Sequence, residues 1–154
     1  MNEQEIKEQL CDVCHKMWQL GWVAANDGNV SVKLEDGAFF ATPTGMSKSF
    51  ITPDKLVRIN DKGEVLEAIK PYLQEHDVML LQNHGALTVG ADLITAYYRM
   101  ETLELFAKIS LNAHLLGGAQ EISRENIDRL CSMRAQYGVT GKPPGYKKYP
   151  NGQN

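Results

Sequence analysis

Two different spacings of apolar residues divide the first part of the chain into a helix and a hairpin. From Glu3 to Leu20 apolar side chains recur every three or four residues, which predicts an amphipathic helix that Gly21 ends. From 30 to 34 apolar and polar residues alternate, as they do along a half-buried strand. Asp36-Gly37 is a strong hairpin signal and predicts that a second strand, 38–41, pairs with the first.

The rest of the chain contains further strands joined by turns, and two more helices. An apolar stripe predicts a helix over Leu93–Leu116, wide enough to pack on a sheet and stopped by Gly117-Gly118. The apolar run Val78–Gln82 predicts a buried strand. The other predicted elements are a helical turn after Thr52, a strand Leu56–Ile59, a hairpin turn Asp61–Gly63, a helix Ile69–Glu75, a strand Ala86–Val89 and a helix from Ser123 to about Tyr137. This order predicts a mainly antiparallel sheet flanked by helices.

Composition and charge exclude several classes of protein. The chain has 154 residues, of which 43% are hydrophobic and 23% charged, so it is long enough to bury a core as one domain. The net charge of -3 gives no basic field for nucleic acid, and no apolar run approaches the length of a membrane span. The acidic N-terminus lacks the order of a signal peptide, which predicts a cytoplasmic protein. Three cysteines, an odd number, argue against a disulfide framework.

The stretch Cys11-Asp12-Val13-Cys14-His15 matches the string for covalent haem attachment. A zinc site would need a second pair of ligands, which the sequence does not offer. Cys14 falls on the apolar face of the first helix, with Cys11 and His15 beside it. We therefore interpret this stretch as helix core with a partly exposed imidazole.

Three turns contain residues that suit ligands. Asp27-Gly28-Asn29 and Thr42-Pro43-Thr44-Gly45 each lie at a strand end, where glycines let backbone N–H groups face an anion such as phosphate. The same residues are those that any tight turn recruits. Asn83-His84-Gly85 places an imidazole between two strands, where it is either a structural turn residue or a metal ligand. Nothing in the sequence indicates a lowered lysine pKa, so Lys33, Lys48, Lys55 and Lys70 are expected on the solvated surface.

Taken together, four stretches of the sequence resemble the class II aldolase/adducin family, which includes L-fuculose-phosphate aldolase and L-ribulose-5-phosphate 4-epimerase. They are "GWVAANDGNVSVKL", "FFATPTGMSKSFITPDKLVRINDKGEVLE", "LLQNHGALTVG" and "AYYRMETLELFAKISLNAHLLGG". The resemblance implies one domain over 1–154, an α/β/α sandwich with a mainly antiparallel central sheet. It also implies a homotetramer with active sites between subunits, which C-terminal tyrosines such as Tyr146 and Tyr149 can reach.

The resemblance also implies roles for individual residues. Gly28, Asn29, Thr44 and Gly45 match positions that bind the substrate phosphate, and His84 matches the third histidine ligand of a divalent metal, usually zinc. The implied reaction cleaves a ketose 1-phosphate of the L-fuculose 1-phosphate type into dihydroxyacetone phosphate and an aldehyde. The 4-epimerase is the alternative enzyme. We prefer the aldolase, because "ATPTG" lacks the lysine that epimerases tend to place before this loop.

The resemblance breaks near 66–69, where family members carry several dozen further residues. That segment holds the catalytic general-base glutamate and a His-x-His pair that supplies the other two metal ligands, and neither motif occurs in this chain. Either the deletion is genuine, which favours a non-catalytic adducin-like module, or a stretch is missing from the sequence as printed. We favour the second explanation, because removing central strands would leave buried backbone groups unpaired. Asp27 is a second departure, since a carboxylate beside a phosphate loop repels the ligand unless it points away or is neutralised.

Overall fold

The computed structural model describes residues 1–60 and 69–138. Three expectations fall outside this part of the chain: the hairpin turn 61–63, the junction that follows Leu66, and the roles of Tyr146 and Tyr149.

The first helix, α1, spans Glu3–Gln19, close to the predicted bounds. Asn2 caps it, because its side chain accepts a hydrogen bond from the Glu5 N–H and the Glu5 carboxylate accepts one from the Asn2 N–H. One face of α1 is buried against the first sheet, and its buried residues are Leu10, Cys11, Val13 and Cys14. The predicted amphipathic helix is confirmed.

The first sheet has three antiparallel strands in the order β1-β2-β3. They are β1 (Ser31–Lys33), β2 (Phe39–Ala41) and β3 (Val57–Ile59), and the predicted turn at Asp36-Gly37 joins the first two. Two short 3-10 turns, η1 (Lys48–Phe50) and η2 (Pro53–Lys55), connect β2 to β3. Phe40 on β2 is 1% exposed and lies at the centre of the core that this sheet forms with α1.

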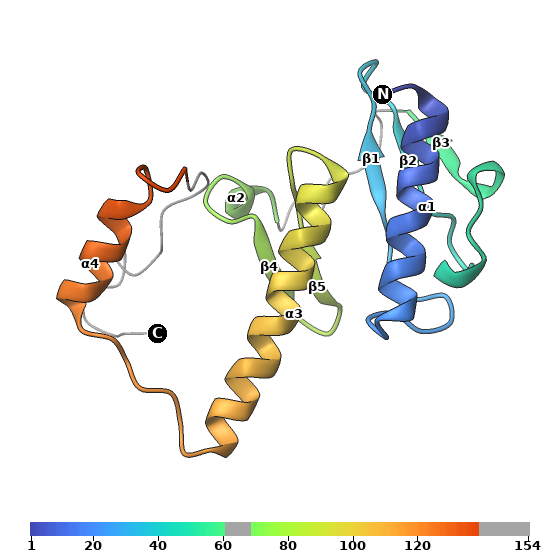
Figure 1. The fold of residues 1–154 in the computed structure, drawn as a ribbon. Coiled ribbons are helices and arrows are strands. Elements are labelled where there is room, and N and C mark those ends of the chain that lie inside the picture. Colours follow the sequence, from blue (N-terminus) through green and yellow to red (C-terminus); the bar gives the residue numbers. More distant parts are fainter. Residues whose placement is uncertain (61–68, 139–154) are drawn as a thin grey trace.

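A second group of elements follows the short helix α2 (Lys70–Leu73). Strands β4 (Val78–Leu81) and β5 (Gly85–Thr88) form an antiparallel pair, and the long helix α3 (Leu93–Leu115) packs against both. Asp92 caps α3 by accepting a hydrogen bond from the Thr95 N–H. The last described helix is α4 (Arg124–Met133), capped by Ser123 as predicted, and Figure 1 shows it set apart from α1 and the first sheet.

The start of α3 connects the two groups. It contacts α1, and the rings of Trp22 and Tyr97 lie 5.7 Å apart between centroids. Leu93 and Tyr97 are buried in the same core as α1 and the first sheet. The second group thus joins this core through the start of α3, and among the described residues the core includes none from β4 or β5.

Two sequence expectations about burial are wrong. Leu80 on the strand predicted to be buried is 77% exposed, and apolar residues along the second half of α3 are exposed, among them Leu105, Phe106, Ile109 and Leu115. The physical reason is that β4 and β5 are only four residues long, too short to cover the 23 residues of α3. Over the described residues, no helix meets the length and apolar character needed to cross a membrane.

Candidate functional site

The two predicted phosphate loops meet at one end of the first sheet. The Val30 N–H donates to the Thr42 hydroxyl at 3.1 Å, and the Thr42 N–H donates to the Val30 carbonyl at 3.0 Å. Asn29 immediately precedes this pair and Pro43 immediately follows it, so the loops 27–29 and 43–45 lie side by side. Both Val30 and Thr42 are buried, which makes this link part of the core.

Glycines shape the two loops, and the loops leave backbone N–H donors without a hydrogen-bond partner. Gly28 has a φ of +76°, and a Cβ there would lie 2.7 Å from Val23 Cγ1, so both conformation and space require glycine. Gly45 has a φ of +78° with open space around it. The N–H groups of Gly28, Asn29, Thr44 and Gly45 form no hydrogen bond within the described part of the chain, and all four residues are exposed. Open N–H groups on adjacent turns are suited to an anion.

Lys48 contradicts the expectation of a solvated lysine, because it is 0% exposed. Its Nζ donates to the Met46 carbonyl at 3.1 Å, directly behind the second loop. Burial lowers the pKa of Lys48, while electrostatic interactions with Cys14 and Asp27 act to raise it. Desolvation is the largest of these effects, so the pKa of Lys48 is lowered overall.

The cysteines and histidine of α1 belong to the core, as the sequence predicts. Cys11 and Cys14 are buried and not in a disulfide, and burial raises the pKa of the Cys14 thiol to about 12. His15 is half-buried, and its Nε2 lies 3.0 Å from the carbonyl oxygen of Ile51, which accepts the hydrogen bond when Nε2 carries the proton. Each group is engaged in packing or hydrogen bonding, which favours a structural role.

His84 lies in the exposed turn between β4 and β5. Its N–H donates to the Leu81 carbonyl at 3.0 Å, and the turn needs positive φ angles at Asn83 (58°) and Gly85 (100°). In residues 1–60 and 69–138, no three His, Cys, Asp or Glu side chains come together in a way that could hold a metal ion. The described residues therefore do not make up a complete metal site.

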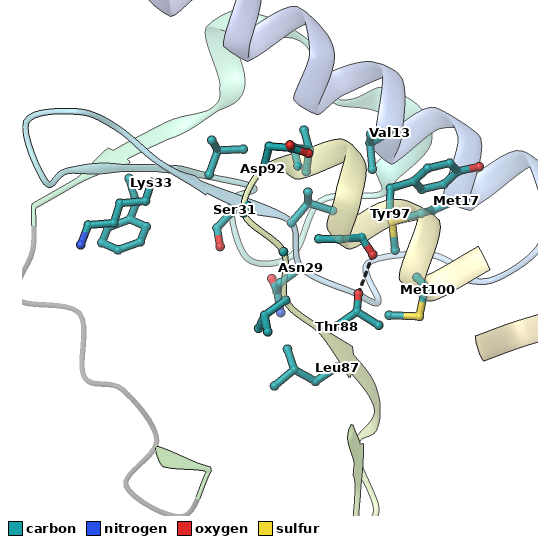
Figure 2. Close-up of a pocket in the computed structure, with 18 of the residues that line it drawn as sticks. Val13, Met17, Asn29, Ser31, Lys33, Leu87, Thr88, Asp92, Tyr97 and Met100 are labelled. Carbon is teal, nitrogen blue, oxygen red and sulfur yellow. Dashed lines mark hydrogen bonds between the residues drawn. The ribbon is translucent and has the colours of Figure 1, made fainter. Parts of the chain in front are cut away.

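A cavity of about 400 Å³ lies between the two sheets, and Asn29 is the one predicted site residue that lines it. Figure 2 shows Asn29 together with Ser31 of β1, Thr88 of β5 and the apolar side chains of Met17 and Met100. Sequence reasoning named Thr42 as part of the candidate turn Thr42-Pro43-Thr44-Gly45 but did not predict its hydrogen bonds to Val30. It also placed Lys48 on the surface, because the burial of Lys48 has no local signature in the sequence.

The family of the protein follows from its sequence match. Residues 8–72 and 64–111 match the family described as Class II Aldolase and Adducin N-terminal domain. The chain belongs to this family. Members of the class II aldolase superfamily include enzymes that generally depend on a divalent metal.

Curated relatives differ in the reactions that their names give. The 3-oxo-tetronate 4-phosphate decarboxylase of Escherichia coli K12 is 33% identical over 69 residues, which cover 45% of this chain and 32% of that protein. The L-fuculose phosphate aldolase of Methanocaldococcus jannaschii is 23% identical over 173 residues, which cover 68% of this chain and 95% of that protein. A methylthioribulose-1-phosphate dehydratase of Microcystis aeruginosa is 38% identical over 58 residues, which cover 38% of this chain and 28% of that protein. The chain thus spans about a third of the decarboxylase, and about 105 of its residues take part in the 173-residue match to the archaeal aldolase.

Solved structures confirm the fold class. YgbL from Klebsiella pneumoniae, a putative aldolase/epimerase/decarboxylase, has a TM-score of 0.71 at 17% identity, covering 84% of this chain and 99% of that one. The L-fuculose-1-phosphate aldolase of Thermus thermophilus has a TM-score of 0.63 at 20% identity, covering 77% of this chain and 98% of that one. The class II aldolase fold with antiparallel strands is therefore confirmed, although the described strands form two sheets where the sequence predicted one.

Replacing Thr42 by valine tests the link between the loops. Valine keeps the size of the side chain but leaves the buried Val30 N–H without its acceptor, which should lower the free energy of unfolding by about 1–3 kcal/mol. Thr42→Ser is the matched control, because it retains the hydroxyl. Urea unfolding measures both variants, and equal stability of the valine and serine variants would contradict the role of this hydrogen bond.

The pKa of Cys14 predicts how stability depends on alkaline pH. The pKa is raised from its ordinary value of 9.0 to about 12, so the folded thiol keeps its proton where the unfolded one loses it. The stabilisation is complete below about pH 9 and is lost as the pH rises toward 12, by at most about 1.4 kcal/mol per pH unit. Urea unfolding between about pH 8 and 10.5 measures this dependence. The free energy of unfolding should fall less with rising pH in Cys14→Ala than in the original protein. Cys131→Ala is the matched control, because it removes a thiol outside this core. Its free energy of unfolding should fall with pH as steeply as that of the original protein.

Proposed function

We propose that this chain provides the phosphate-binding part of an aldolase that cleaves a ketose 1-phosphate of the L-fuculose 1-phosphate type. The products would be dihydroxyacetone phosphate and an aldehyde. The observation that carries the proposal is the pairing of Val30 with Thr42, which brings the open N–H groups of two loops to one place. The names of the decarboxylase, aldolase and dehydratase relatives all include a phosphate, which supports a phosphorylated sugar as the ligand.

Each residue of the loops has a proposed part in binding. The N–H groups of Gly28, Asn29, Thr44 and Gly45 donate to phosphate oxygens, and the Asn29 and Thr44 side chains add neutral donors. The buried ammonium of Lys48 supplies positive charge from behind the second loop. Holding the phosphate fixes the triose end of the sugar relative to the rest of the site.

The metal and the general base require residues beyond those that the structure describes. We propose His84 as one ligand of a divalent metal, with zinc as the preferred ion, but a catalytic zinc ordinarily takes three protein ligands. The described residues offer no such group, and no glutamate matches the family's general base. The chain as printed is therefore expected to bind the sugar phosphate without cleaving it. A cytoplasmic homotetramer with sites between subunits stays a prediction.

A second candidate reaction is decarboxylation of a 3-oxo-tetronate 4-phosphate. This reaction is favoured by the higher sequence identity to the Escherichia coli decarboxylase, which is 33% over 69 residues against 23% over 173 residues for the archaeal aldolase. The decarboxylase match covers only 45% of this chain, whereas the aldolase match covers 68% of it, so the aldolase is the preferred proposal. The 4-epimerase and a non-catalytic adducin-like module are two further candidates, and the module becomes the better proposal if the central deletion is genuine.

Binding of L-fuculose 1-phosphate tests the proposal, with Lys48→Met as the informative variant. Methionine keeps most of the buried stem and removes the charge, so titration calorimetry should show affinity about fivefold to tenfold lower, roughly 1–1.4 kcal/mol. Lys55→Met is the matched control, because Lys55 is an exposed lysine nearby, and its affinity should equal that of the original protein.

The same samples separate binding from reaction. With zinc present, the 154-residue chain should release no dihydroxyacetone phosphate, since the general base and two metal ligands are absent from its sequence. Release of the triose would show that the chain contains a complete site. Equal affinities for all three proteins, or tighter binding of 3-oxo-tetronate 4-phosphate than of L-fuculose 1-phosphate, would argue against the proposed substrate.

A further inference from the structure

Two Asp-Gly pairs occur in the chain, Asp27-Gly28 in the first phosphate loop and Asp36-Gly37 in the turn between β1 and β2. Both aspartates are exposed. Asp-Gly bonds are especially prone to spontaneous rearrangement, because glycine has no side chain to shield its backbone nitrogen. The surroundings of each pair in the fold therefore decide how readily it reacts.

The rearrangement needs only the aspartate, the N–H of the following glycine, and water. The glycine nitrogen attacks the carboxyl carbon (Cγ) of the protonated aspartate. An N–Cγ bond forms, the Cγ–OH bond breaks, and the hydroxyl leaves as water with the N–H proton. The product is a five-membered succinimide ring, in which the nitrogen is bonded to two carbonyl carbons.

Hydrolysis of the ring has two outcomes. Water that cleaves the bond from the nitrogen to Cγ restores aspartate. Water that cleaves the bond from the nitrogen to the main-chain carbonyl carbon leaves an isoaspartyl linkage. Its backbone then runs through Cβ and Cγ, and a free carboxylate remains on Cα. No oxidant, reductant or cofactor takes part.

Hydrogen bonds hold both reacting groups of Asp36-Gly37. The Gly37 N–H donates to the Leu34 carbonyl at 3.1 Å. One oxygen of the Asp36 carboxylate accepts from the Ala38 N–H at 3.1 Å, and the other pairs with Arg58. The bond from Ala38 is the main cause that lowers the pKa of Asp36, so the protonated carboxyl that reacts is rarer. The attack would first have to break these hydrogen bonds.

The reacting groups of Asp27-Gly28 lack such partners. Within residues 1–60 and 69–138, neither the Gly28 N–H nor the Asp27 carboxylate forms a hydrogen bond. Lys48 interacts with Asp27 electrostatically but donates its hydrogen bond to the Met46 carbonyl. The turn just before the pair is strained, since Ala25 has a φ of 46°, which residues other than glycine rarely adopt. In this part of the chain, no hydrogen bond of either group opposes the attack.

We propose that Asp27-Gly28 is a modification site at which the chain forms isoaspartate spontaneously, while the fold protects Asp36-Gly37. The product adds one main-chain carbon between Asp27 and Gly28. The loop is closely packed at this point, because a Cβ on Gly28 would lie 2.7 Å from Val23 Cγ1. The extra carbon therefore displaces Gly28 and Asn29 from their positions.

The modification inactivates the first phosphate loop, a consequence that rests on the proposed function. Isoaspartate displaces two of the N–H groups that are proposed to bind phosphate, and it keeps a negative charge beside them. The binding site thus has a limited lifetime that its own sequence sets. The rearrangement itself does not depend on which ligand the loop binds.

Peptide mapping of aged protein tests the proposal. The 154-residue chain is incubated at neutral pH and digested with trypsin, which releases the two pairs in separate peptides, 17–33 and 34–48. Electron-transfer fragmentation distinguishes isoaspartate from aspartate in each. Isoaspartate should accumulate about tenfold faster in 17–33, a factor that corresponds to roughly 1.4 kcal/mol of lost hydrogen bonding in the other peptide. Equal rates, or a faster rate in 34–48, would overturn the proposal.

Incubation in urea provides the reference for the unfolded chain. Without the fold, the hydrogen bonds of Asp36 and Gly37 are lost, so the two peptides should form isoaspartate at rates within about twofold of each other. A tenfold difference that persists in urea would assign the effect to neighbouring residues in the sequence and overturn the role of the fold.

Asp27→Glu is the informative variant, because the attack by Gly28 would then have to close a six-membered ring, which forms far more slowly. The rearranged form of peptide 17–33 should no longer accumulate. Asp36→Glu is the matched control and should leave the rate in 17–33 unchanged. An equal loss of the product in both variants would contradict the assignment to Asp27.

An NMR titration with inorganic phosphate tests the consequence for binding. The amide resonances of Gly28 and Asn29 should shift in the fresh chain but not in the isoaspartyl form after its separation by ion exchange. Phosphate binding by the isoaspartyl form would overturn this consequence. If the fresh chain itself binds no phosphate, the proposed function fails, whereas the peptide map still decides whether Asp27-Gly28 is modified.

Discussion

The pair of hydrogen bonds between Val30 and Thr42 is the contact on which the candidate site depends. It lies at the end of the β1–β2 hairpin, is buried, and holds two glycine-containing loops against each other. Neither loop alone has more than ordinary turn chemistry. Their adjacency creates a group of open N–H donors, and the hairpin creates the adjacency, so a feature of sheet pairing produces the proposed binding site.

Lys48 adds charge to that geometry. A lysine with no exposed surface is uncommon, and here its stem is buried under the second loop while its Nζ binds the Met46 carbonyl. The arrangement places a cation behind a loop that is proposed to bind an anion.

Local signals in the sequence were sufficient to predict the elements but not their burial. The cap at Ser123, the turn at Asp36-Gly37 and the stop at Gly117-Gly118 depend on neighbouring residues, and the structure has all three. The exposure of Leu80 and the burial of Lys48 depend on which distant segment covers a residue, and periodicity contains no such information. The adjacency of the phosphate loops follows from the hairpin that Asp36-Gly37 predicts, because the paired strands end at these loops. Family resemblance supplied those residues, and the structure supplied the link between them.

The central claim is that the two loops act as one anion site. The most direct measurement is an NMR titration of the 154-residue chain with inorganic phosphate. The account predicts that the amide resonances of Gly28, Asn29, Thr44 and Gly45 shift together with a single dissociation constant. Shifts in only one loop, or different constants for the two loops, would contradict it.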